Sequence, residues 1–290
     1  MPRILARKDP STFKTQPLHV EATPQRLVYQ PLGAPLNFAQ MLERRQPLQI
    51  DNPQHFTCEL ANLGVSVRLT LAWRGRDYWL LVRQQRRDRG DCVLKLISGY
   101  VPSHELHLPL HTALQEVAEE CLVETPRGWL GGRFGEHWLP TPHDASLPHH
   151  AQYHYRISPL SGAARRVHAG NLPLLERPQA YVHQPTASLQ LVYDLRLELP
   201  EALKKPSLFH SDECLENGVL LSRLDRQCPD LYLLPVDNPH GELFTLQSGE
   251  LQRTAVDNLW LSEGFAAQEG WLIRDERIAW ADWVRQRRCA

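Results

Sequence analysis

The 290-residue sequence lacks any long apolar run. No stretch approaches the roughly 18 apolar residues that a membrane-spanning helix needs. The basic N-terminal segment also lacks the apolar stretch that a secretory signal requires. We therefore expect no membrane span and no secretory signal, and we interpret the protein as cytoplasmic.

The sequence also lacks an excess of either charge, since the formal net charge is −1. Proteins that bind nucleic acid or membrane surfaces through general electrostatics are usually strongly basic, so the composition disfavours both kinds of partner. The six cysteines are scattered and include no C-x-x-C pair. This spacing predicts free thiols in a reducing compartment rather than a disulfide framework.

Several familiar site motifs are missing. The glycine-rich stretch 128–135 fits neither G-x-G-x-x-G nor the phosphate loop, and no G-x-S-x-G is present. His143, His149, His150 and His154 lie close together without a cysteine nearby, so we expect a surface loop there rather than a zinc site. The sequence thus argues against a P-loop ATPase, a Rossmann protein and an α/β-hydrolase.

What the sequence does contain is clear periodicity. Alternating residues predict a hairpin of strands at 65–71 and 78–83, with a third strand at 92–97 and a later one at 189–199. Asn217-Gly218 and Ser248-Gly249 are typical of further hairpin turns. Capping signals predict helices at 37–45 and 52–63, and a tryptophan-rich helix is expected at 278–287.

The segment 109–122 carries the most informative pattern. Leu110, Ala113, Leu114, Val117, Ala118 and Cys121 form one apolar stripe of a helix. Glu116, Glu119 and Glu120 share a neighbouring face near the C-terminal end, where repulsion and the helix dipole both disfavour them. A bound divalent cation would reverse both penalties, whereas a solvated acidic face is the alternative.

The preceding residues favour the cation, because the whole segment resembles a Nudix box, G-x5-E-x7-R-E-U-x-E-E-x-G-U with U a bulky aliphatic residue. The matching residues are Gly99, Glu105, Glu116, Val117, Glu119, Glu120 and Val123. The resemblance implies a Nudix-like α/β/α sandwich with a mixed sheet, in the α/β (α+β) class, with N- and C-terminal extensions. It covers about 25 residues of motif.

The resemblance also implies an activity, namely hydrolysis of a nucleoside diphosphate linked to another group, or of a similar diphosphate. Glu116, Glu119 and Glu120 would hold Mg²⁺, with Mn²⁺ as a second candidate, and the metal would activate a water. Glu105 would assist as a metal ligand or a base. Arg83 and Lys95, on strands that lead toward the box, would bind the substrate phosphates.

The sequence departs from the family pattern in three places. Nine residues rather than seven follow Glu105, and we expect the extra turn at 106–108 to move Glu105 away from the metal. Gln115 replaces an arginine that orients the acidic side chains. Leu122 replaces a helix-ending glycine, so we expect the helix to continue toward Thr125-Pro126.

These departures leave two other functions open. The chain could be a catalytically degenerate Nudix-fold protein that binds a nucleotide or a protein partner, or an RNA-processing Nudix enzyme with a basic channel. The predicted organisation is an N-terminal arm with helices at 1–60, a Nudix-like core at 61–200 and C-terminal hairpins with a helix at 201–290. An insertion is expected at about 139–180. Oligomeric state and substrate identity are not readable from the sequence.

Overall fold

The hairpin predicted from alternating residues forms the centre of the protein. It consists of β7 (Asn62–Trp73) and β8 (Arg76–Arg86). Arg74 and Gly75 both have positive φ, 51° and 80°, as a two-residue hairpin turn of the primed type requires. Both faces of β7 are largely buried, so this hairpin supports elements on either side.

The coordinates come from a computed structural model. It describes residues 2–23, 26–44, 46–52, 55–60, 62–86, 91–160, 166–169, 172–175, 179–183, 187–238, 242–254 and 270–273.

Hydrogen-bonded neighbours link seventeen strands of the described residues into one mixed sheet. β7 pairs antiparallel with β8 and with β10 (Ile97–Tyr100), and parallel with β18 (Ser188–Glu198). The other strands are β1 (Arg3–Lys8), β9 (Asp91–Lys95), β11 (Cys121–Thr125), β12 (Gly128–Phe134), β13 (His137–Trp138), β14 (His149–Pro159), β17 (Gln179–His183), β19 (Ser207–Glu216), β20 (Val219–Leu224), β21 (Leu231–Pro235), β22 (Phe244–Gln247), β23 (Glu250–Arg253) and β24 (Gly270–Ile273).

Smaller elements lie beside this sheet. A three-stranded sheet comprises β3 (Leu18–Thr23), β4 (Arg26–Pro31) and β6 (Phe56–Leu60), and two-stranded ones comprise β2 (Lys14–Thr15) with β5 (Leu36–Asn37) and β15 (Arg166–Ala169) with β16 (Leu172–Leu175). Single turns of 3-10 helix cover Pro10–Thr12 and Ser103–Glu105. Helix α1 (Phe38–Arg44) begins with a reciprocal cap, because Asn37 and Gln40 exchange side-chain hydrogen bonds with each other's backbone N–H.

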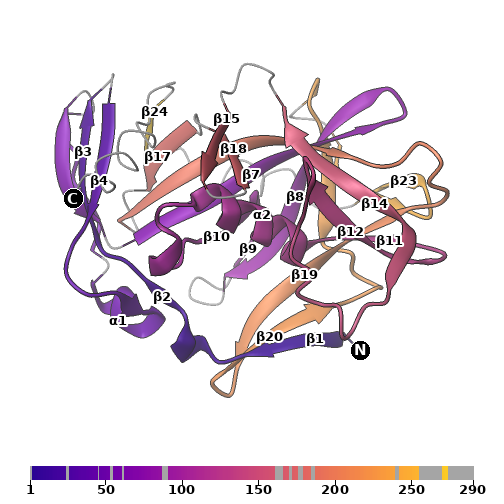
Figure 1. The fold of residues 1–290 in the computed structure, drawn as a ribbon, viewed down its shortest axis with the longest axis horizontal. Coiled ribbons are helices and arrows are strands. Elements are labelled where there is room, and N and C mark those ends of the chain that lie inside the picture. The colour runs from indigo at the N-terminus through magenta and orange to yellow at the C-terminus, as the bar shows by residue number, and fades with distance from the viewer. Residues whose placement is uncertain are drawn as a thin grey trace.

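Helix α2 (Pro109–Glu120) is the helix of the motif, and it lies across β7 and β10 near the middle of the molecule (Figure 1). Its apolar stripe packs into the main core: Leu110, Ala113, Leu114 and Val117 are all at most 2% exposed. The helix ends at Glu120, since Cys121 is already extended, with φ −104° and ψ 94°, and begins β11. The expected continuation past Leu122 is therefore wrong, because strand pairing ends the helix without a left-handed residue.

The predicted α/β/α sandwich is also wrong. Within the described residues only α1 and α2 are α-helices, and α1 packs beside β2 and β5 rather than on the large sheet. A sandwich needs helices on both faces of its sheet, whereas this protein surrounds one helix with strands. The predicted helix at 52–63 is replaced by β6 and the start of β7, and the helix at 278–287 lies outside the described residues.

Candidate functional site

Three glutamates of α2 lie beside the strand that carries Gly99. The helix buries Leu114 and Val117, and Cys121 just after it is 1% exposed, which agrees with the predicted wheel. Glu116, Glu119 and Glu120 are partly buried on the adjacent face. The helix therefore presents a row of carboxylates at its C-terminal end, next to β10.

Gly99 is required by the position of one of these carboxylates. A Cβ added to Gly99 would lie 1.9 Å from Oε1 of Glu116 and 2.2 Å from its Cδ. Real Cβ atoms do not approach oxygen so closely, so only glycine leaves room for the Glu116 carboxylate here. Gly99 and Glu116, the glutamate of the box that begins its acidic face on the helix, are thus in direct contact.

A second strand brings more acidic residues to the same place, and no local sequence pattern points to them. Because α2 leads directly into β11 and Cys121 pairs with His210 of β19, the residues after His210 run back alongside the end of the helix. Asp212 and Glu213 both act electrostatically on Glu120, and Glu213 also acts on Glu116. We call Glu116, Glu119, Glu120, Asp212 and Glu213 the acidic cluster.

Crowding changes the ionisation of this cluster. Burial raises the pKa of Glu116 well above its ordinary value, and the charges of Glu120, Glu119 and Glu213 raise it further against the opposing effect of Lys95. Burial likewise raises the pKa of Glu120 to about 7, with Lys95 opposing and the neighbouring carboxylates adding to it. The cluster therefore holds more negative charge than the surrounding protein compensates.

Glu120 also carries an unsatisfied atom. Its side chain is 13% exposed, and its buried Oε2 has no hydrogen-bond partner. Nε2 of His210 lies 3.8 Å from this atom, on a side chain that is 4% exposed. Burial and Lys95 lower the pKa of His210 to about 3, so His210 is neutral and adds no positive charge beside the carboxylate.

Two lysines face the acidic cluster. Lys95 at the end of β9 donates to the Ser98 hydroxyl over 3.0 Å and acts electrostatically on Glu116 and Glu120. Lys8 at the end of β1 donates to Glu119 over 2.7 Å and to Glu213 over 3.1 Å. Lys95 is thus close to the glutamates as predicted, whereas Lys8 comes from an N-terminal segment that carried no signal for the site.

Glu105 lies at the other end of α2. Its carboxylate accepts from the Thr112 hydroxyl over 2.8 Å and is 3.1 Å from Nδ1 of His111. At about 1.5 Å of rise per residue, Glu119 is about 10 Å further along the helix axis than Thr112. The longer spacer therefore separates Glu105 from the acidic cluster and makes its carboxylate a partner of the first helical turn.

Arg83 is not brought to the cluster. In the pairing of β8 with β9, Arg83 lies opposite Leu94, and its side chain shares the face of Leu81. Lys95 lies opposite Val82, on the other face, which packs with α2. Its guanidinium pairs with Asp230 at 3.5 Å. Side chains alternate between the faces of a strand, so Arg83 and Lys95 point to opposite sides of the sheet.

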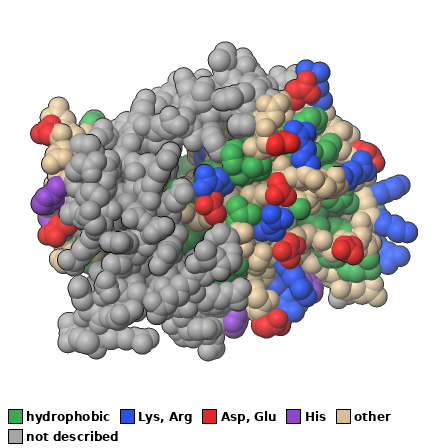
Figure 2. All heavy atoms as spheres, turned by 90° about the horizontal axis from the view of Figure 1, so that it is seen from above, with side chains coloured by type: hydrophobic (Ala, Val, Ile, Leu, Met, Phe, Trp, Pro, Cys, Tyr) green, Lys and Arg blue, Asp and Glu red, His purple; other side chains and the backbone are tan. Residues whose placement is uncertain are grey.

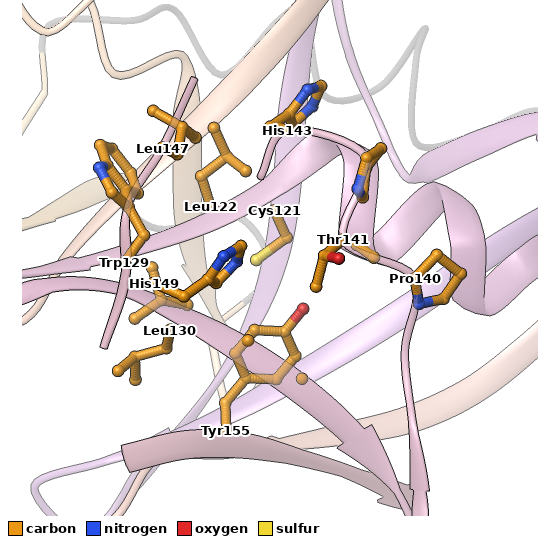
Figure 3. Close-up of a pocket in the computed structure, with 15 residues that line it drawn as sticks. Cys121, Leu122, Trp129, Leu130, Pro140, Thr141, His143, Leu147, His149 and Tyr155 are labelled. Atoms are coloured by element: carbon orange, nitrogen blue, oxygen red, sulfur yellow. The ribbon is translucent and has the colours of Figure 1, made fainter. Parts of the chain in front are cut away.

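A small cavity borders the end of α2 and the start of β11 (Figure 3). His143, Tyr155, Trp129 and Cys121 line it, and Nε2 of His143 is 3.2 Å from the Glu119 carbonyl oxygen. It offers about 20 Å³ to water, which is room for roughly one molecule. This cavity is too small for a nucleotide.

The acidic cluster fits a metal in chemistry but is not assembled around one. Within the part of the chain that the structure describes, no three His, Cys, Asp or Glu side chains are placed to hold a metal ion together. Lys8 instead bridges Glu119 and Glu213. The donors are nonetheless the carboxylate oxygens that Mg²⁺ prefers, and Oε2 of Glu120 is buried without a partner.

Neither a known protein-family model nor a curated protein matches this sequence. The resemblance to a Nudix box therefore rests on the motif residues themselves. Among the described residues, no helix is both long and apolar enough to cross a membrane. None of Cys58, Cys121, Cys214 and Cys228 is in a disulfide, as the scattered spacing predicted.

Proposed function

We propose that the acidic cluster supports magnesium-dependent hydrolysis of a diphosphate bond, as the Nudix-like motif implies. The observation that carries this proposal is the Glu120 carboxylate, which is buried beside other carboxylates with one oxygen unpartnered. An uncompensated buried charge is costly. A cation bound here would remove that cost, and a purely structural surface has no need to incur it.

Glu116, Glu119, Glu120 and Glu213 are the residues that would hold magnesium. When bound, the metal would neutralise charge on the diphosphate and activate a water. Contact with Gly99 fixes the position of the Glu116 carboxylate. The ammonium of Lys95, already close to Glu116 and Glu120, can pair with a phosphate oxygen at the same place.

Binding without turnover is the second candidate function. It is favoured by the ion pairs of Lys8, which already partly neutralise Glu119 and Glu213, and by Gln115, where the family has an arginine.

An RNA-processing role has less support. On the one face that Figure 2 shows, basic and acidic side chains of the described residues are interspersed and form no continuous basic strip.

The experiment is a magnesium-dependent phosphate-release assay with a coupled phosphatase on nucleotide sugars and dinucleoside polyphosphates. We expect the wild type to turn over at least one of them and Glu120→Gln to lose about 100-fold or more, because the metal that would activate the water loses a ligand. Glu136→Gln, the same change on a side chain that is 92% exposed, serves as the matched control. Binding of a panel member without turnover would support the second function, and no response to magnesium would contradict the first.

A further inference from the structure

Lys8 occupies a position in the acidic cluster that a metal ion would need. Its Nζ bridges Glu119 of α2 and Glu213 of β19, at 2.7 and 3.1 Å. These carboxylates come from α2 and β19, which contact each other here, and a bound cation would draw on both. A tethered ammonium already sits between them.

Strand pairing holds Lys8 beside Glu213, because β1 and β19 are both hydrogen-bonded to β20. β1 pairs antiparallel with β20, with Lys8 opposite Leu220, and β20 pairs in turn with β19. The strand thus carries Lys8 to the edge of the cluster, where its side chain is 39% exposed. Glu213 accepts a further hydrogen bond from the Ser222 hydroxyl of β20 over 3.3 Å.

The neighbouring charges are not neutralised by this contact. Glu120 retains an unpartnered buried oxygen, and the almost fully buried His210 directs Nε2 toward it while its own Nδ1 has no partner. Lys8 therefore compensates Glu119 and Glu213, whereas Lys95 only partly offsets the burial of Glu120. A divalent cation drawn to the free oxygen of Glu120 would meet Lys8 at the neighbouring carboxylates.

We propose that Lys8 is a built-in competitor of the divalent cation and becomes a phosphate-binding residue when the metal enters. An ammonium and a metal cannot both lie between Glu119 and Glu213, so metal binding must displace Lys8. The displaced ammonium stays tethered at the exposed edge, where it can pair with the anionic diphosphate. This inference rests on the proposed function, and it predicts that substrate and metal bind more tightly together than either does alone.

The test uses Lys8→Met, which keeps the apolar stem and removes the charge. Magnesium alone is titrated calorimetrically into the wild type and the variant. Methylenediphosphonate, a diphosphate analogue that is not hydrolysed, is then titrated in saturating magnesium. We expect the variant to bind magnesium about 10-fold more tightly and the analogue about 10-fold more weakly.

Two further variants control for simpler effects. Arg7→Met removes one positive charge from an exposed neighbour on the same strand, and Lys14→Met removes one from an exposed lysine of β2; both should bind like the wild type. Equal magnesium affinity in all four proteins, or tighter binding of both ligands by Lys8→Met, would overturn the role of Lys8. Absence of magnesium binding from all four would overturn the proposed function with it.

Discussion

A glutamate whose side chain is 13% exposed lies at each end of helix α2, Glu105 in the 3-10 turn before it and Glu120 as its last residue, yet the two carboxylates behave in opposite ways. At the N-terminal end, burial would raise the pKa of Glu105, but hydrogen bonds from His111 and Thr112 outweigh it and lower the pKa. At the C-terminal end, burial and nearby carboxylates raise the pKa of Glu120 to about 7. Burial alone therefore does not decide the charge of a carboxylate in this protein.

What differs between the two ends is the set of partners. Glu105 has a donor for each of its oxygens, so its negative charge strengthens the fold. Glu120 faces a neutral histidine and other acids, and Lys95 offsets them only in part, so its charge weakens the fold. The comparison separates a carboxylate whose charge the fold satisfies from one whose charge the fold leaves partly unsatisfied.

The largest expected effect comes from Glu120→Gln in the metal-free protein. The pKa of Glu120 is about 7 in the folded protein and 4.5 ordinarily. This difference lowers the free energy of unfolding by at most about 3 kcal/mol at pH 8. Because the raised pKa belongs to an acid, this cost is absent below pH 4.5 and grows as the pH rises toward 7. Denaturant unfolding should show the variant to be more stable than the wild type by up to about 3 kcal/mol at pH 8 and nearly equal at pH 4.5.

Glu119→Gln provides the contrast on the same helix face. Glu119 is paired with Lys8, so its replacement should give no such gain at pH 8. A Glu120→Gln protein that is no more stable than the wild type at pH 8 would show that the charge of Glu120 is already compensated. The contrast between the two ends of α2 would then fail.

An intermediate effect is expected for Gly99→Ala. The added Cβ would meet the end of the Glu116 side chain at 1.9 Å, so the carboxylate must move; because this end is flexible, the cost is about 1 kcal/mol, at the low end of overpacking. Gly64→Ala makes the same kind of clash with the end of Gln190, at 2.3 Å. Both variants should lose stability in thermal unfolding, but only Gly99→Ala should also weaken magnesium binding. Equal magnesium affinities would contradict a metal role for Glu116.

Local patterns in the sequence predicted much of what surrounds the site. Alternation identified the β7–β8 hairpin, and Asn217-Gly218 and Ser248-Gly249 identified the turns after β19 and β22. The apolar stripe placed α2 and the orientation of its glutamates. The nine-residue spacer correctly indicated that Glu105 is removed from the rest of the box. These features depend on residues that are close together in the chain, so local sequence patterns suffice to predict them.

The rest depends on pairings between distant segments. Glu213 and Lys8 join the acidic cluster only because β19 pairs with β11 and β1 pairs with β20, and no local pattern specifies those partners. Asn52 looked like a helix cap, but β6 pairs with β3 instead, so tertiary pairing overrode the local preference. The sandwich was wrong for the same reason, because a shared motif helix does not specify how many strands surround it.

The most direct test of the central claim is a calorimetric magnesium titration of the wild type, Glu120→Gln and Glu105→Gln. We expect Glu120→Gln to lose at least 10-fold in magnesium affinity. Glu105→Gln should bind magnesium within about twofold of the wild type while losing about 1 kcal/mol of stability, since it weakens hydrogen bonds from His111 and Thr112. An equal loss of affinity in both variants, or a loss confined to Glu105→Gln, would contradict the assignment of the metal to the C-terminal end of α2.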